Sequence, residues 1–174
     1  MQLLLKRITN KGFTILEVTF AIGLFSIGLL SIGSLMLQNI KVQDVNKNNL
    51  TASMLAQEGL ELVRNQRDRN WITDGANWDD DLNHSGGHYV IDIEGMNNAS
   101  NNSADFTSEA AARLYINASG YYVHNGVGTT PTIFYRKIFT DLDSDSIKVT
   151  SVVQWKDRGF LHNYTAMTLL YNWR

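Results

Sequence analysis

Glu17 is the residue whose position most strongly indicates chemistry, because it is the only charge in the apolar run of residues 13–37. A carboxylate at the centre of a bilayer destabilises an inserted helix by about 3 kcal/mol, and by less near the interface. Acids inside such runs therefore usually mark a functional contact, although an acid near the membrane edge can also reach water. Glu17 is the leading candidate for a functional side chain.

A second candidate is the acidic turn that holds Asp141, Asp143 and Asp145 at alternate positions. This spacing matches the first three ligands of an EF-hand loop, which continues with a glycine and ends with a bidentate glutamate. Ser146 and Val152 stand at those two positions. The pattern is half complete, and it leaves open two interpretations, a calcium site and a solvated acidic hairpin turn.

The remaining polar residues form no recognisable catalytic motif. His84 and His88 have no third ligand at a diagnostic metal spacing. The sequence contains no nucleophile elbow, phosphate loop or zinc signature, and the lack of cysteine excludes disulfides and thiol ligands. We therefore expect a protein that is not an enzyme and that has no cofactor other than the calcium ion considered above.

Charge is distributed unevenly along the chain. The first twelve residues carry three cations, Lys6, Arg7 and Lys11, and no acid, so the remainder must sum to −5 for the whole to be −2. The basic end and the acidic body should meet different environments. The small net charge gives no general attraction to nucleic acid, so none is inferred as a partner.

The element that must position Glu17 is the apolar run itself. At 1.5 Å per residue, a helix over residues 13–37 spans roughly 38 Å, which exceeds the hydrocarbon layer of about 30 Å. The preceding cations predict a single-pass segment, with residues 1–12 in the cytoplasm and the acidic body outside. An ordinary secretory signal would have a shorter apolar core and then a small-residue cleavage site, and this sequence has neither.

The string Lys11-Gly12-Phe13-Thr14-Ile15-Leu16-Glu17 resembles the processing and assembly motif of type IV prepilins and of the related secretion pseudopilins. The resemblance covers the basic leader, the glycine before phenylalanine, the glutamate at a fixed offset and the long uncharged helix. It implies that prepilin peptidase cuts between Gly12 and Phe13 and that the new Phe13 amine is N-methylated. It also implies that Glu17 neutralises the Phe13 ammonium of a neighbouring subunit, or its own, in a filament.

The pattern stays helical to about residue 67. Its apolar stripe, at spacings mostly of three and four, is Val42, Val45, Ala52, Leu55, Ala56, Leu60 and Val63. The same segment carries Glu58, Glu61, Arg64 and Arg67, which we expect on a solvated face with i, i+3 ion pairs. The chain thus divides into a leader (1–12), a transmembrane and assembly helix (13–37), its amphipathic continuation (38–67) and a β-rich head (68–174).

The head begins with loop-forming residues up to about residue 105, interrupted by a short strand at 88–93. Four β-rich runs follow, at 113–117 leading into 120–124, at 132–140, at 147–155 and at 163–173. Their short connections predict an antiparallel meander that packs on the apolar stripe of the long helix. The predicted class is α+β, and the resemblance implies the type IV pilin fold.

The resemblance further implies a structural subunit of a bacterial type IV filament for adhesion, twitching motility or DNA uptake, or alternatively a pseudopilin of a type II secretion system. Its implied partners are other pilin subunits, prepilin peptidase, the membrane assembly platform and, before assembly, membrane lipid. The implied location is the inner membrane, then a surface pilus or a periplasmic pseudopilus.

Major pilins often carry a proline in the apolar helix, whereas this helix has none and contains Gly23, Gly28 and Gly33. That departure favours a minor subunit. From another class, a membrane-anchored binding module or enzyme with an uncleaved helix remains an alternative.

Overall fold

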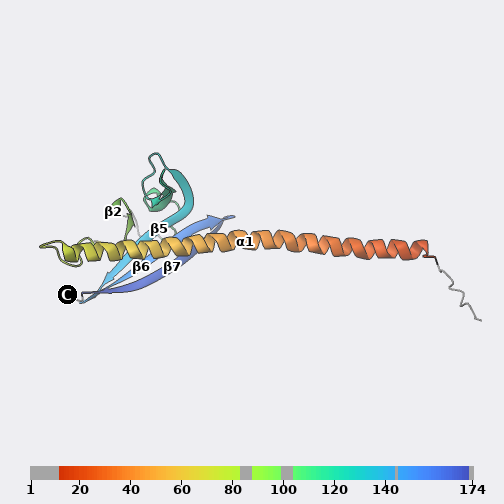
Figure 1. Cartoon of the computed structure of the whole chain (residues 1–174), viewed down its shortest axis with the longest axis horizontal. Coiled ribbons are helices and arrows are strands. Elements are labelled where there is room, and N and C mark those ends of the chain that lie inside the picture. Colours follow the sequence, from red (N-terminus) through yellow and green to blue (C-terminus); the bar gives the residue numbers. More distant parts are fainter. Residues whose placement is uncertain (1–11, 83–87, 99–103, 144, 173–174) are drawn as a thin grey trace, which may run out of the picture. The chain divides into compact units, whose positions relative to one another are not determined.

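A computed structural model describes residues 12–82, 88–98, 104–143 and 145–172. The predicted leader, apart from Gly12, lies outside these residues, as does His84. The chain divides into two units, Met1–Asn46 and Lys47–Arg174. Helix α1 (Ile15–Ile72) contributes residues to both, and a β-sheet follows it in the sequence (Figure 1). The predicted α+β class, with one long N-terminal helix and a C-terminal antiparallel sheet, is confirmed at this level.

Helix α1 ends at Ile72 rather than near residue 67 as predicted. The next residue able to stop a helix by its own conformation is Gly75, whose φ is +83°. Asn70 is buried, and its amide donates to the backbone oxygens of Trp78 and Asp80 at 3.2 and 2.7 Å. These contacts hold the following loop against the last helical turn, so tertiary structure extends the helix beyond its sequence signal.

In the described part of the head, seven strands form one antiparallel sheet. Its centre is β5 (Thr130–Leu142), which pairs with β6 (Ser146–Asp157) on one edge. On its other edge β5 pairs with both β1 (His88–Asp92) and β3 (Arg113–Ile116). Three further strands extend the sheet: β2 (Gly95–Asn98) beyond β1, β4 (Tyr122–Val123) beyond β3, and β7 (Phe160–Tyr171) beyond β6.

The predicted meander is confirmed only for β5, β6 and β7. Strand β7 follows β6 through Arg158 and Gly159, whose φ angles of +50° and +85° fit a tight two-residue hairpin turn. Strand β2 and the 3₁₀ turn η1 (Ala110–Ala112) were not predicted. The sequence of β2, Gly-Met-Asn-Asn, has low strand propensity, and its pairing with β1 makes it a strand.

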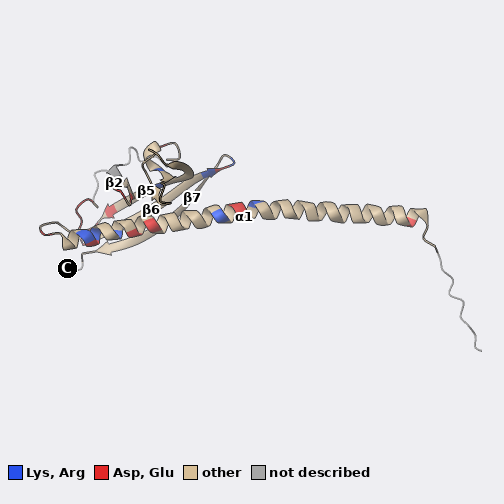
Figure 2. Ribbon diagram, turned by 45° about the horizontal axis from the view of Figure 1, so that its top comes forward, with Lys and Arg blue, Asp and Glu red and all other residues tan. Residues whose placement is uncertain are grey.

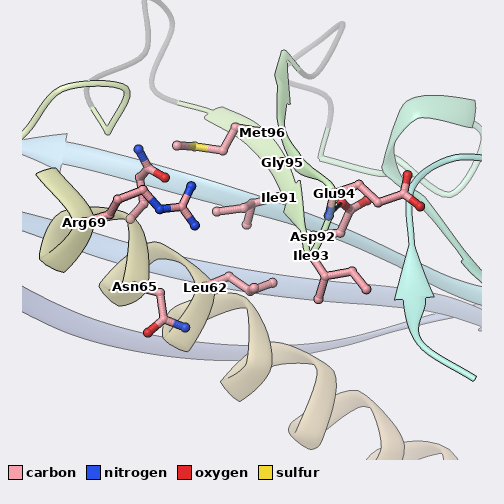
Figure 3. Close-up of a pocket in the computed structure, with 10 residues that line it drawn as sticks. Leu62, Asn65, Arg69, Ile91, Asp92, Ile93, Glu94, Gly95 and Met96 are labelled. Atoms are coloured by element: carbon pink, nitrogen blue, oxygen red, sulfur yellow. Dashed lines mark hydrogen bonds between the residues drawn. The ribbon is translucent and has the colours of Figure 1, made fainter. Parts of the chain in front are cut away.

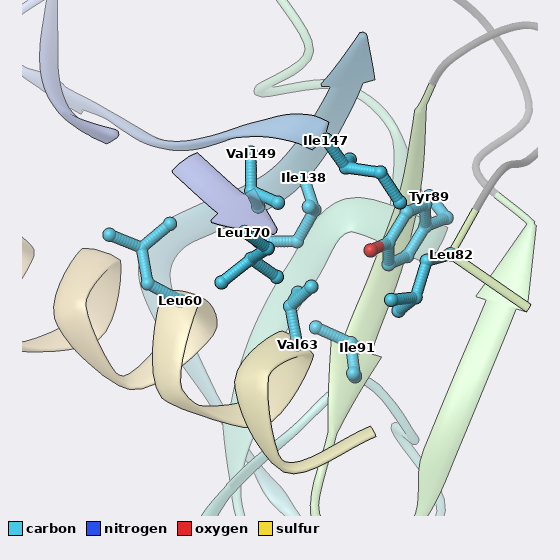
Figure 4. Packing of buried hydrophobic residues seen from close by; sticks show 9 residues of the cluster. All are labelled: Leu60, Val63, Leu82, Tyr89, Ile91, Ile138, Ile147, Val149 and Leu170. Atoms are coloured by element: carbon cyan, nitrogen blue, oxygen red, sulfur yellow. The ribbon is translucent and has the colours of Figure 1, made fainter. Parts of the chain in front are cut away.

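The residues 47–72 of α1 pack on one face of the sheet through the predicted apolar stripe. Its members from Ala52 to Val63 are buried, whereas Val42 is exposed. One buried cluster, shown in Figure 4, is formed by Leu60, Val63, Leu82, Tyr89, Ile91, Ile138, Ile147, Val149 and Leu170. A second is formed by Ala52, Leu55, Ala56, Leu114, Phe134, Val153 and Trp155. The stripe therefore contributes to both of the clusters that lie between α1 and the sheet.

The opposite face of the sheet is covered in part by residues 104–112. Phe106 and Ala112 form a third buried cluster with Val90, and partly buried Tyr135 and Val152 pack against it. The side chain of Gln154 fixes this segment, since it accepts from the Phe106 N–H at 3.0 Å and donates to the Ala104 oxygen at 2.7 Å.

Candidate functional site

Thr14 caps the start of helix α1. The Glu17 backbone N–H donates to the Thr14 hydroxyl at 3.2 Å, and the Val18 N–H donates to the Thr14 carbonyl at 3.1 Å. Thr14 is thus the N-cap and Glu17 is the third helical residue, the spacing of a capping box. An acid in the first turn also meets the positive end of the helix dipole. The Thr-x-x-Glu spacing was visible in the sequence, but its capping role was not predicted.

The Gly12–Phe13 peptide bond lies just before this cap. Neither residue is helical, both are exposed, and the Phe13 side chain is 81% accessible. No atom lies within 4 Å of the position that a Cβ on Gly12 would take. The predicted cleavage bond is therefore accessible and outside regular structure.

The apolar residues that follow are exposed on every side of the helix. None of the large apolar side chains from Ile15 to Ile40 is buried, although residues at all helical angles are apolar. In Figure 2 the helix carries no coloured charge between Glu17 and Lys41. Within the described residues, α1 contains the one segment that is long and apolar enough to cross a membrane.

The hydroxyl groups of this segment bond within their own helix. Thr19, Ser26 and Ser31 donate to the carbonyls of Leu16, Ile22 and Ile27 at 2.8–2.9 Å. A hydroxyl that already has a partner is less costly to transfer into an apolar environment. Apart from its adjacent residues and the nearby backbone of the helix itself, a Cβ on Gly23, Gly28 or Gly33 would have no neighbouring atom within 4 Å. The segment is suited to lipid or to the apolar surface of another helix.

The head contains buried charges that sequence reasoning missed. Arg136 on β5 is fully buried on the face that packs against α1. Its guanidinium donates to the Leu55 carbonyl at 2.9 Å and to the Ile91 carbonyl at 2.7 Å, and it lies 3.5 Å from the Glu58 carboxylate. Burial lowers the pKa of Arg136, while Glu58 and Asp92 act in the opposite direction. This side chain joins α1, β1 and β5.

The next residue, Lys137, points to the opposite face of the sheet. It is fully buried, forms an ion pair with buried Glu109, and its ammonium lies 5.1 Å from the centre of the Phe106 ring. The two cations therefore hold different segments against the two faces of β5. Because both side chains are enclosed by protein, they stabilise the fold of the head and are not accessible to a ligand. The sequence did contain one sign of this burial, since Arg136 and Lys137 are two adjacent charges inside the otherwise apolar run from Phe134 to Phe139.

Of the charges expected on the solvated face of α1, only one pair follows the prediction. Arg64 and Glu61 form the i, i+3 ion pair. Glu58 instead contacts Arg136, and Arg67 bonds to Asp68 and lies 4.4 Å from the centre of the Trp71 ring. The prediction was wrong for Glu58, because the partner comes from a strand distant in sequence.

His124 is a half-buried titratable group whose pKa responds to Arg136. Its backbone N–H donates to the Asp92 carboxylate at 2.6 Å, and its ring Nδ1 lies 3.2 Å from the Arg113 carbonyl. Burial, followed by the positive charge of Arg136, lowers the pKa of His124 from 6.5 to about 4. The imidazole is therefore neutral near pH 7.

The other predicted candidates stay apart from this region. Asp141 is the last but one residue of β5, Asp143 and Asp145 follow it in the sequence, and residue 144 between these two lies outside the described residues. In the residues that are described, no three His, Cys, Asp or Glu side chains gather in a way that could hold a metal ion. His88 lies beside Phe139 on the neighbouring strand, with ring centroids 6.1 Å apart.

A shallow groove of about 270 Å³ lies between α1 and the β1–β2 hairpin (Figure 3). Its helix side carries Leu62, Asn65 and Arg69, and its strand side runs from Ile91 to Met96. None of the predicted site residues lines it, and its acidic and basic groups are mixed.

No protein-family model matches the chain, and no curated protein or solved structure is similar enough to count as a match.

Proposed function

We propose that the chain is a type IV pilin-like structural subunit, with the type IV pilin fold, that is cleaved after Gly12 and assembled through its apolar helix. The observation that carries the proposal is the arrangement at the helix start. An accessible Gly12–Phe13 bond precedes a capped turn containing Glu17, and an uncharged helix with no buried side chain follows. A minor subunit of a surface filament is the role we favour.

Cleavage would create a cation at the start of the helix. The new Phe13 amine has an ordinary pKa near 8, so it is mostly an ammonium at neutral pH, roughly 6 Å along the helix axis from Glu17. A cation at a helix N-terminus is unfavourable, because the dipole already makes that end positive. The negative charge of Glu17 would offset both the Phe13 ammonium and the positive end of the helix dipole.

In a filament core, either charge alone would be strongly destabilising, and pairing makes both tolerable. A subunit placed out of register would leave an ammonium and a carboxylate unpaired. The same helix would hold the subunit in the inner membrane before assembly, with its head outside, because nothing in its own unit buries its apolar side chains. The pair would therefore select the register in which subunits add.

The test is intact-mass analysis of the protein made with and without prepilin peptidase. With the peptidase, the mass should fall by that of residues 1–12 and rise by one methyl group. Gly12→Val should stay full-length, because a side chain at that position would obstruct the peptidase. Gly23→Val, a matched change in the middle of the helix, should still be cleaved. A full-length chain recovered from sheared filaments would overturn the proposal.

A further inference from the structure

Strand β7 leaves one long edge of the sheet unpaired in the described part of the chain. It pairs with β6 along its whole length, from Ser146 opposite Tyr171 to Asp157 opposite Phe160. No strand of the described residues pairs with its other edge, which is the outer edge of the sheet (Figure 1). The other outer strands, β2 and β4, have only four and two residues. Short edges resist pairing with other chains, and β7, with 12 residues, lacks that protection.

The composition of β7 offers no other protection. Its sequence, FLHNYTAMTLLY, contains no Asp, Glu, Lys, Arg, Pro or Gly. Charged side chains and proline are the usual means by which exposed edges avoid pairing. Strand β7 is therefore able to accept a further strand.

An apolar patch lies beside this edge on the sheet face opposite α1. Met167, Leu169 and Tyr171 are 65%, 52% and 53% exposed, whereas the intervening Leu170 is buried in the core. Strand alternation places these three residues on one face. A shallow hollow lined by Lys148, Met167, Thr168 and Leu169 lies at the same place.

The distribution of side chains along β7 suits a second copy of the same strand. On this face of β7, three exposed apolar residues gather in the last five positions, whereas the first half carries Leu161 followed by Asn163 and Thr165. Antiparallel pairing about a two-fold axis through Ala166 would place Leu169 against Asn163. Pairing about an axis through Leu169 places Leu169 against Leu169 and Met167 against Tyr171. The first register also places Met167 against Thr165, and only Tyr171 meets an apolar residue, Leu161. The second register pairs each of Met167, Leu169 and Tyr171 with an apolar residue, and it brings the Met sulfur to an aromatic ring.

The charges of the neighbouring strands are compatible with this register. The strand pairings align Asp141, Lys148 and Leu169 across β5, β6 and β7. A two-fold axis at Leu169 continues that row as Leu169, Lys148 and Asp141 of the second copy. The like-charged lysines are then separated by two strands, and the uncharged leucines meet at the centre.

We propose that the last five residues of β7 are a docking edge for a second copy of this chain, paired antiparallel about a two-fold axis at Leu169. The contact goes beyond the proposed filament function. A two-fold contact closes on itself, whereas the contacts that build a filament repeat along it, so this edge joins two heads and does not extend a filament. Cleavage after Gly12 and pairing at Leu169 are thus tested separately, and either proposal can be wrong while the other holds.

Cysteine crosslinking tests the register directly, because the native chain contains no cysteine. The full chain carrying Leu169→Cys is purified in detergent, at a ratio of one chain per micelle, and oxidised mildly. Residues directly opposite in a sheet have Cβ atoms about 4.5–5.5 Å apart, close to disulfide range, so a covalent dimer is expected. The control Thr165→Cys lies on the same face, but its two copies would be roughly 27 Å apart and should not crosslink.

A charge variant tests the association in solution. Leu169→Lys places two ammonium groups opposite each other and should weaken dimerisation, measured by sedimentation of the detergent-solubilised chain, by about tenfold or more. Asn163→Lys adds the same charge on the same face, away from the pairing segment, and should leave it unchanged. A monomeric native chain at all concentrations, or equal crosslinking at positions 165 and 169, would overturn the proposal.

Discussion

The two parts of helix α1 differ in what surrounds them, although they share one secondary structure. From Ile15 to Ile40 no large apolar side chain is buried, and from Ala52 to Val63 one apolar stripe is buried against the sheet. The first part is apolar all round, and the second alternates an apolar stripe with charged residues. An all-round apolar helix needs lipid or other subunits as its environment, whereas a striped helix finds its environment in its own fold.

The acids of the two parts differ in the same way. Glu58 has a partner within its own unit, since Arg136 on β5 lies 3.5 Å away. Among the described residues, the contact given for Glu17 is a local one, since its backbone N–H donates to the Thr14 hydroxyl. A carboxylate in an apolar helix requires compensation when water is removed, and in the proposed filament the Phe13 ammonium would supply it. Breaking each arrangement should therefore affect a different property of the protein.

The largest effect is expected from Arg136→Ala. Removal of the guanidinium eliminates its hydrogen bonds to the Leu55 and Ile91 carbonyls and leaves Glu58 without its cation. The free energy of unfolding of the head should fall by about 3–5 kcal/mol, the range for breaking a buried pair. Urea denaturation followed by the fluorescence of buried Trp155 measures it. Arg64→Ala, which breaks an exposed pair, should lower it by less than about 1 kcal/mol, and equal losses would contradict the assignment.

Glu17→Gln should affect assembly and leave the head unchanged. Glutamine has nearly the shape of glutamate, and the cap at Thr14 uses the backbone N–H of residue 17, so the substitution removes the charge and leaves the cap intact. The variant should be exported, cleaved and stable in the membrane, yet depleted from sheared filaments about tenfold or more, because the Phe13 ammonium loses its partner.

Quantitative blotting of filaments against membranes measures this ratio. Glu61→Gln, an exposed acid in the second part of the helix, is the matched control and should be incorporated normally. Normal incorporation of Glu17→Gln would show that apolar packing alone drives assembly.

Acid should destabilise the head through His124. Its pKa is about 4 in the folded state and 6.5 when unfolded, so the unfolded chain binds more protons between these values. The stability contributed by neutral His124 is complete above pH 6.5 and is lost as the pH falls toward 4. Between pH 7 and 5 the loss should be about 2 kcal/mol. His124→Leu should remove this component from the pH profile, and an unchanged profile would assign it to other groups.

Sequence reasoning located elements whose signals are local. The β-rich runs at 132–140, 147–155 and 163–173 and the apolar stripe from Ala52 to Val63 were sufficient to locate β5, β6, β7 and the buried face of α1. Features created by distant contacts were missed. Asn70 extends α1 by bonding to a later loop, and β2 exists because β1 pairs with it.

At the candidate site, the sequence was enough to identify Glu17 as the single acid of an apolar helix. The cap at Thr14 could also have been predicted, from the Thr-x-x-Glu spacing of residues 14–17. The burial of Arg136 and Lys137 could not be predicted with the usual assumption that charged side chains face water. Only the three-dimensional arrangement shows that Leu55, Ile91 and Glu109 supply their partners.

Two glycines of α1 provide the smallest and most direct comparison. A Cβ on Gly59 would lie 2.7 Å from the Ser151 hydroxyl and 3.0 Å from a methyl of Ile138, whereas a Cβ on Gly28 would have no neighbour within 4 Å. Alanine favours a helix over glycine by about 1 kcal/mol at either position. At Gly59 overpacking of about 1–3 kcal/mol opposes that gain, so Gly59→Ala should lower the unfolding free energy of the head by about 1 kcal/mol. Gly28→Ala should leave it unchanged, which urea denaturation of the two variants in the same detergent can resolve.

If Gly28→Ala is nevertheless excluded from filaments while its head is intact, the open space at Gly28 must be occupied by a neighbouring helix, since small residues allow close helix packing. If Gly59→Ala leaves the head as stable as the native protein, the close approach of α1 to the sheet cannot be the reason for glycine at that position.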